Sequence, residues 1–198
     1  MSGIPGDRLT HYTGSTSTTD QTLTSPSVSN ISLNSNLQTP AGLNQLTQQI
    51  TQNADLVISG NATQANMPSQ MSASNPMTVV VNGNFSMTGN YTGYGLLVVT
   101  GNFAYSGDSG WKGVVLVIGH GTTNFLGTGG GNNEFDGAML VANIKDSSGN
   151  LLTALGTNNF NISGGGGNGI YYNSCWINAA QSPSTYKMLS YREIAYGD

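Results

Sequence analysis

The first part of the chain is polar, and a single helical pattern follows it. Ser, Thr, Asn and Gln dominate residues 1–39, which predicts a polar, extended N-terminal arm. Apolar residues then recur at helical spacings of three and four, at Leu43, Leu46, Ile50, Ala54 and Val57. Thr39 suits the N-cap, Pro40 suits the first helical position, and Gly60 suits the position after the last turn. The pattern predicts one amphipathic helix over residues 40–59.

From residue 77 the pattern changes to short β-branched runs separated by glycine and asparagine. VVVNGNF at residues 79–85 recurs as LVVTGNF at 97–103 and as VLVIGHG at 115–121. Repeats this short cannot bury a hydrophobic face alone, so successive copies must stack. We expect a β-repeat body over residues 77–178, with structural turns at the equivalent glycines Gly83, Gly101 and Gly119.

A second series of glycines precedes the apolar runs. Gly95 precedes LLVV, Gly113 precedes VVLVI, Gly137 precedes AMLVA and Gly169 precedes IYY. The spacing grows along the chain, as it would if insertions lengthened the later repeats. We therefore expect structural turns at Gly137 and Gly169 as well.

The predicted fold class is mainly β, as a parallel β-solenoid or β-helix-like stack of repeats with glycine corners, flanked by the amphipathic helix. The apolar runs occupy consecutive positions, and the repeated GNF places like residues on like. An antiparallel β-sandwich is the alternative, because glycine-rich turns at roughly ten-residue intervals suit it too. Residues 40–198 would form a single domain, closed at one end by a C-terminal strand over residues 185–194.

The charge pattern limits the partners of the chain. Charged residues make up only 7% of it, and its net charge is −4. The five Lys and Arg residues are scattered singly, whereas a nucleic-acid surface needs them clustered. We therefore expect no nucleic-acid partner. The one cysteine, Cys175, forms no disulfide within the chain, and no apolar stretch reaches the roughly 18 residues of a membrane span.

Three acidic residues are weak candidates for a metal site. Glu134 and Asp136 stand two apart, so they share one face of a strand, and with Asp108 they could bind calcium or act as glycosidase carboxylates. His120 replaces an asparagine of the repeat, and no motif supplies the orienting partner that a general base needs. The loop GTGGGNN at 127–133 lacks the Lys-Ser/Thr pair of a phosphate-binding loop. We expect no catalytic residue and no cofactor.

Aromatic residues are candidates for a recognition surface that stacks on carbohydrate. The set contains Tyr91, Tyr94, Tyr105 and Trp111, together with Tyr171, Tyr172 and Trp176. Aromatic residues in strands more often pack in the core or against neighbours on adjacent strands. The two interpretations differ in whether the aromatic side chains line one exposed face.

Six blocks of sequence between Pro40 and Ile194 carry a resemblance to a known family. They are PAGLNQLTQQITQNADLVISGNAT, NPMTVVVNGNFSMTG, YGLLVVTGNF, WKGVVLVIGHG, GGGGNGIYYNSCW and YKMLSYREI. In the order and spacing of these blocks, the chain resembles the soluble region of PilX-type, minor-pilin-like assembly proteins of type IV pilus systems. The resemblance implies a non-enzymatic role in pilus assembly, adhesion or secretion. Such proteins begin with a hydrophobic prepilin-type helix, so we expect a membrane connection only through an anchor helix absent from this chain.

These observations together favour an extracellular or cell-surface structural protein of the bacterial envelope. Its expected partners are pilus components or other surface proteins, with surface glycans as a further class. An extracellular glycan-binding β-solenoid module is the alternative function, and it needs the aromatic residues on one exposed face. A carbohydrate-active β-helix enzyme is the second alternative, and it needs the acidic residues or His120 to converge in one groove.

Overall fold

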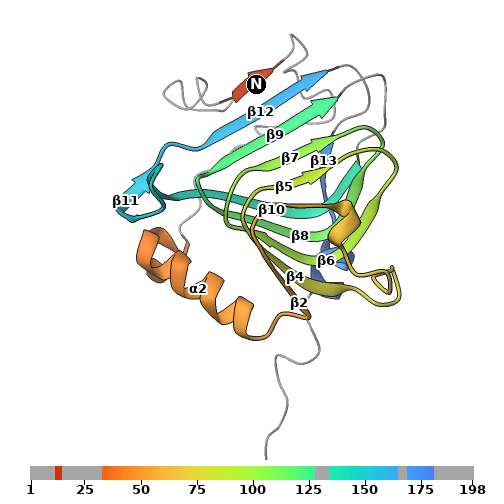
Figure 1. Ribbon diagram of the computed structural model, residues 1–198, viewed down its shortest axis with the longest axis horizontal. Helices are drawn as coiled ribbons and strands as arrows, with labels where there is room; N and C mark the ends of the chain where they lie inside the picture. The colour runs from red at the N-terminus through yellow and green to blue at the C-terminus, as the bar shows by residue number, and fades with distance from the viewer. Residues whose placement is uncertain (1–11, 15–32, 128–133, 165–168, 181–198) are drawn as a thin grey trace, which may run out of the picture.

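The computed structural model describes residues 12–14, 33–127, 134–164 and 169–180, and in these residues the fold is mainly β (Figure 1). Sheet A contains, in spatial order, β1 (Tyr12–Gly14), β12 (Asn159–Gly164), β9 (Thr122–Gly127), β7 (Phe103–Ser106), β5 (Phe85–Met87) and β3 (Ala62–Thr63). Sheet B contains β11 (Leu151–Gly156), β10 (Glu134–Lys145), β8 (Gly110–Gly119), β6 (Thr92–Val99), β4 (Met77–Asn82) and β2 (Leu56–Ser59). A further strand, β13 (Gly169–Tyr172), also pairs with β10.

From β2 to β9 the chain alternates between the two sheets, and each strand pairs in parallel with the strand two places later. The register follows the sequence repeat, because Val79 pairs with Leu97 and Leu97 pairs with Val115. Among the named strands of the described residues, only β10 and β11 pair antiparallel. Both sheets are therefore rich in parallel pairs, and the antiparallel β-sandwich is excluded.

The main core lies between the two sheets. Val79, Leu97 and Val115 are fully buried and occupy equivalent positions on β4, β6 and β8. On the opposite sheet the rings of Phe85 and Phe103 stack with centroids 5.9 Å apart and an interplanar angle of 5°. Like side chains thus pack on like along the stack, and each of these buried side chains contributes roughly 1.5–3 kcal/mol of burial free energy.

Glycine and asparagine form the corners that follow β2, β4 and β6 of sheet B. Gly83 and Gly101 lie between strands, and Gly119 ends β8. A Cβ atom on Gly101 would lie 2.6 Å from the carbonyl carbon of Gly83, so only glycine fits this contact. Beside it, the backbone N–H of Asn102 donates to the side-chain Oδ1 of Asn84 at 2.8 Å. Successive turns of the chain are therefore joined at this corner by side-chain as well as backbone bonds.

Two of the glycines expected at turns lie in strands instead. Gly137 is inside β10, where it is the Cα partner of Gly113, and Gly169 begins β13. The backbones of Gly113 and Gly137 have φ of +145° and +143°, a region that side chains disfavour, so these glycines serve close strand packing and not a turn. The partner of Gly137 on β13 is Tyr172, so the expected equivalence of Gly137 and Gly169 is wrong by three residues.

The helix begins where it was expected and ends earlier. It is α2 (Pro40–Gln52), capped by the Thr39 hydroxyl, which accepts from the backbone N–H of Gly42 at 3.1 Å. The prediction of helix to residue 59 is wrong, because Leu56, Val57 and Ile58 pair as β2 with β4. Periodicity alone does not separate these apolar residues from a last helical turn. The β body therefore starts at β2 and not at residue 77.

Helix α2 covers the outer face of sheet B (Figure 1). Its Leu43 is buried with Ile118, Ala142 and Ile144 of β8 and β10 in a second, smaller core. Short helical segments also occur at η1 (Ser35–Gln38), η2 (Gln64–Asn66) and α3 (Ser174–Ala179), the last of them within the expected β body. No helix in the described ranges is both long and apolar enough to cross a membrane. The predicted strand at 185–194 lies outside these ranges, as does most of the arm at 1–39.

Candidate functional site

The most distinctive surface feature is a row of polar and aromatic residues across the outer face of sheet B. Tyr94 on β6 is the Cα partner of Lys112 on β8, and Lys112 is the partner of Asp136 on β10. Tyr171 on β13 is the next partner in the same row. In a parallel sheet, Cα partners on neighbouring strands present their side chains on the same face. Two tyrosines, a lysine and an aspartate are thereby brought into line from positions far apart in the sequence.

The centre of this row is an ion pair. The Lys112 ammonium lies 2.5 Å from Oδ2 of Asp136, with both side chains largely removed from water. Because each charge is balanced by the other, the pair gives the row a fixed dipole and not a net charge. Asp136 is thus a partner of Lys112, and within the described residues its carboxylate belongs to no group of three or more potential metal ligands.

Helix α3 places an aromatic ring over the ion pair. The ring of Trp176 lies 5.9 Å from the Lys112 ammonium and 5.7 Å from the ring of Tyr94, tilted by 54°. Asn173 caps the helix, since its side chain accepts from the backbone N–H groups of Cys175 and Trp176. We call Tyr94, Lys112, Asp136 and Trp176 the outer cluster. It combines aromatic faces with a shielded charge pair, a combination suited to flat polar ligands as well as to anchoring α3.

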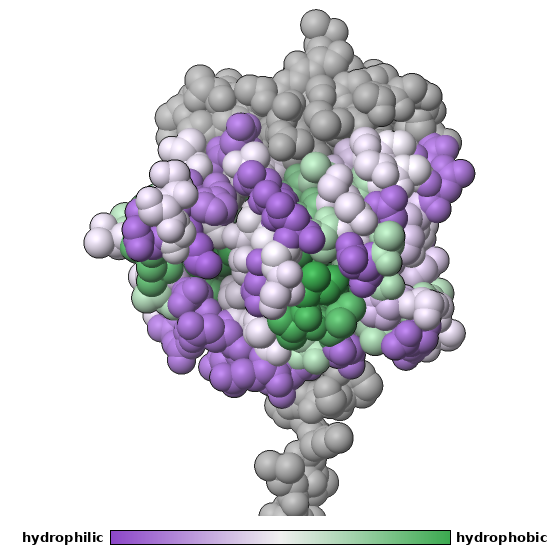
Figure 2. Space-filling model, in the orientation of Figure 1, coloured by the Kyte–Doolittle hydropathy of each residue, from purple (hydrophilic) through white to green (hydrophobic). Residues whose placement is uncertain are grey.

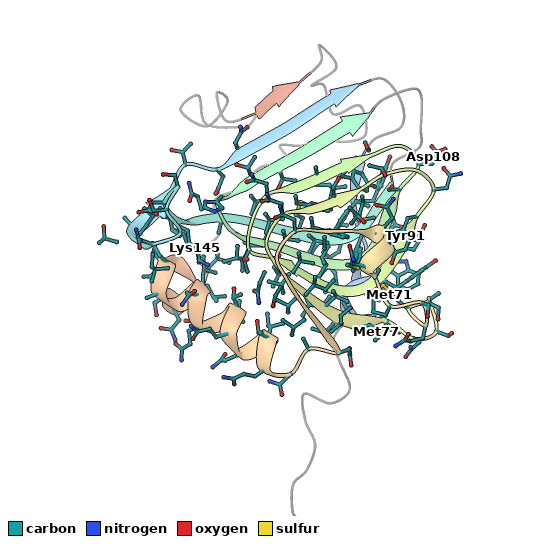
Figure 3. The ribbon with its side chains drawn as sticks, viewed as in Figure 1. Met71, Met77, Tyr91, Asp108 and Lys145 are labelled. Atoms are coloured by element: carbon teal, nitrogen blue, oxygen red, sulfur yellow. The ribbon has the colours of Figure 1, made fainter. Side chains whose placement is uncertain are left out.

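Tyr91 belongs to a neighbouring contact. Its hydroxyl donates to the sulfur of Met71 at 3.7 Å, and the same sulfur accepts from the backbone N–H of Tyr94 at 3.2 Å. Figure 3 shows Tyr91 and Met71 on the same side of the molecule, with Asp108 farther out. Burial raises the pKa of the Tyr91 phenol above its ordinary value, because the phenolate would lose hydration. Tyr91 is therefore partly a packing residue.

Two of the aromatic residues expected on a recognition surface are in the core. Tyr105 is 1% exposed and Trp111 is fully buried. The indole N–H of Trp111 donates to the carbonyl of Gly95 at 2.9 Å, and its ring occupies the space that a side chain on Gly93 would need. The prediction that they take part in surface recognition is wrong, because strand alternation turns both side chains inward.

The exposed aromatic residues come instead from the end of the described chain. Tyr171 and Tyr172 on β13 are 48% and 80% exposed. The sequence held a signal for the outer cluster: Tyr94, Lys112 and Asp136 each stand one position before a glycine of the Gly95, Gly113 and Gly137 series. Aligning the residues that precede these glycines predicts the row.

The weak candidates for a metal site are not brought together in the described residues. No group of three or more His, Cys, Asp or Glu side chains there is placed to hold a metal ion. Asp108 is exposed in the loop before β8, and Glu134 begins β10, its side chain lying outside the described part. His120 forms an isolated bridge with Asn143 at the corner after β8. The corner position expected for His120 fits this bridge.

Comparison of the chain with protein-family models, with curated proteins and with solved structures finds no match. The function of the protein is therefore inferred from the chemistry and arrangement of its residues, and from the resemblance of the sequence blocks described above.

Proposed function

We propose that this chain is a non-enzymatic structural protein whose two parallel sheets form one β-solenoid, with each turn of the chain contributing a strand to each sheet. The observation that carries the proposal is the stacking of equivalent residues on neighbouring strands, as in Gly95, Gly113 and Gly137. Such a stack is a stiff rod with long sides, which suits a scaffold or a display surface.

The arrangement of the charged groups supports a role without catalysis. The outer cluster uses its lysine and its aspartate to satisfy each other. An acid–base or nucleophilic mechanism needs a reactive group beside a base that a third group orients. The described contacts of His120 and Asp136 do not have that form, so we infer that this surface serves recognition and not chemistry.

We further propose that the protein works at the bacterial cell surface, in the assembly or adhesive function of type IV pili. Support comes from the resemblance to PilX-type proteins and from an outer surface rich in Asn, Thr, Ser and Gln but poor in charge. Its partners would be pilus components or other surface proteins, bound through the uncharged polar sides and the ends of the stack.

The test is deletion of the gene in the bacterium that encodes it. We expect fewer surface pili by electron microscopy, or weaker adhesion to a surface, with recovery when the wild-type gene is returned. A matched complementation uses Gly113→Ala, which should fail because it disrupts the stack. Unchanged pilus number and adhesion in the deletion strain would overturn the pilus role.

A second candidate function, glycan binding, is favoured by one observation. Tyr171 and Tyr172 present exposed rings on β13, and α3 with Trp176 follows directly in the chain. Exposed aromatic rings at a flat polar surface stack on sugar rings. A glycan array should then find a ligand whose affinity falls at least roughly tenfold in Tyr172→Ala, while Leu155→Ala, a change at an exposed apolar residue of β11, has no effect. An array without ligands would remove this candidate.

A further inference from the structure

Strand β2 forms one edge of sheet B, and no strand of the described residues lies on its outer side. Within the described residues β2 pairs only with β4, through Leu56 to Ser59 against Val79 to Asn82. The backbone N–H and C=O groups on the far side of an edge strand are a template for another strand. The same end of the molecule also carries the last strand of sheet A, β3.

The β2 edge is apolar as well as open. Figure 2 shows a hydrophobic area over β2, bordered by the hydrophilic surface of α2. Val57 is 41% exposed, whereas Val80 and Val98, its equivalents on the next two strands of sheet B, are fully buried. Val57 is therefore the one member of this row, from β2 to β6, that lacks a covering neighbour. A further strand beside β2 would cover the side of Val57 that faces away from β4.

The devices that usually protect an edge strand are missing here. Proteins guard exposed edges with Lys, other charges, proline or bulges. The segment LVISGNAT at residues 56–63 contains no charged residue and no proline. Asp55, just before it, is engaged, because its carboxylate accepts from the backbone N–H of Thr78 at 2.7 Å. An edge strand without such protection pairs readily with a strand of another chain.

We propose that a second copy of this chain covers the β2 edge, by antiparallel pairing of β2 with β2 about a two-fold axis. The edge is uncharged, so two identical edges meet without like-charge repulsion. The surrounding surface is uncharged too, since α2 has no acidic or basic residue from Pro40 to Gln52. This surface has no charge pattern that would select a different protein as partner. In a two-fold dimer, by contrast, the same apolar strand is present on both sides of the interface.

A two-fold axis at this edge also continues both sheets. It brings β3 of sheet A to the same interface as β2, so a second copy offers a strand to each sheet, and a single extended peptide offers only one. The contact centres on Val57, with Leu56 and Ile58 at its sides. The inference concerns assembly of the chain with itself and does not depend on the pilus role.

The test is the molar mass of the intact chain by sedimentation equilibrium, from about 1 µM to about 100 µM, because a four-residue edge supports weak association. We expect a monomer–dimer equilibrium for the wild type and a monomer throughout for Val57→Lys. The matched control is Leu155→Lys, which places the same charge on a comparably exposed apolar residue of β11 and should leave the dimer intact.

Two further variants keep the test sharp. Val57→Thr preserves the β-branched shape and should weaken dimerisation about tenfold even if the lysine variant fails to fold. Val57→Cys with Cys175→Ser should form a disulfide-linked dimer under mild oxidation. A wild type that stays monomeric at about 100 µM, or a dimer disrupted by Leu155→Lys and not by the Val57 variants, overturns the proposal.

Discussion

At the scale of single residues, glycine sets how closely neighbouring strands approach. Gly95, Gly113 and Gly137 follow one another across β6, β8 and β10, each with positive φ. A Cβ atom on Gly113 would lie 2.1 Å from the carbonyl oxygen of Gly95, inside any permitted contact. This packing has an entropic cost, because glycine loses more backbone conformational freedom on folding than any other residue.

Gly113→Ala should therefore be among the most destabilising single changes in the chain. We expect a loss of about 3 kcal/mol or more in the free energy of unfolding, because both the positive φ and the backbone collision oppose a side chain. For a chain of this size that lowers Tm by roughly 6–12 °C. Thermal denaturation followed by circular dichroism measures it.

The matched control for that change is Gly89→Ala. Gly89 also has positive φ, +74°, but nothing lies within 4 Å of the added Cβ. Only backbone strain remains, so we expect a loss of about 1 kcal/mol. Equal Tm shifts for the two variants would show that contact between strands is not what requires glycine at position 113.

Asp146 carries a prediction about pH. It lies in the turn between β10 and β11, where its carboxylate accepts from the side chain of Asn150 at 3.1 Å and from the backbone N–H of Asn150 at 2.8 Å. These bonds lower the pKa of Asp146 below its ordinary value of 3.8. The stabilisation they bring to the hairpin is present above the unfolded-state pKa, and it is lost as the pH falls through the lower folded-state pKa.

The pKa of Asp146 can be measured by NMR titration of its carboxyl carbon. Asn150→Ala removes the largest cause of the shift and should move the pKa of Asp146 back toward its ordinary value. An Asp146 pKa that does not move in Asn150→Ala would contradict the role of this turn.

At the scale of elements, α3 depends on its contacts with sheet B. Six residues are too few for a helix to be stable alone, so Asn173 as cap and Trp176 as anchor must hold it. The Trp176 ring contacts Tyr94 and the Lys112 ammonium from two different strands. The outer cluster is thus first a joint between α3 and the sheet.

Trp176→Ala should release α3 from the sheet. We expect the free energy of unfolding to fall by about 2 kcal/mol, which is less than for a core tryptophan because the ring of Trp176 is partly exposed. Trp176→Phe keeps an aromatic face and should recover most of it. Fluorescence gives a second readout, since Trp111, the remaining tryptophan, is buried and should resist acrylamide quenching. An unchanged Tm in Trp176→Ala would mean that α3 does not need this anchor.

The elements also show what could be predicted from the sequence. The repeat of VVVNGNF predicts the register of β4, β6 and β8, because a parallel stack places identical residues on one another. The start of α2 follows from Thr39 and Pro40, whose roles are local. Consecutive apolar residues do not reveal which side faces inward, so the sequence left open whether Trp111 lies in the core or on the surface. The glycine series at Gly113 and Gly137 predicts that Lys112 lies beside Asp136, but not that the two side chains form an ion pair.

At the scale of the whole molecule, the strands of each sheet follow one another in a single row. Each interior strand contacts its two neighbours in a sheet, so stability is a sum of nearest-neighbour terms that is smaller at the ends. Among the described strands of sheet B, β6 has β4 and β8 beside it, whereas β2 has only β4 beside it. The end that carries β2 is therefore the weaker one unless a second copy covers it.

Native-state hydrogen exchange should follow that order. In the monomer at low concentration, we expect the amides of β6 and β8 to exchange most slowly, those of β4 to be intermediate, and those of β2 to exchange fastest. Raising the protein concentration should slow β2 selectively if the proposed dimer forms, because its outer N–H groups gain partners. Val57→Lys is the control, since it should abolish the concentration effect and leave β6 and β8 unchanged. Exchange at a single rate across all four strands would contradict a stack held by nearest-neighbour contacts and indicate one cooperative unit.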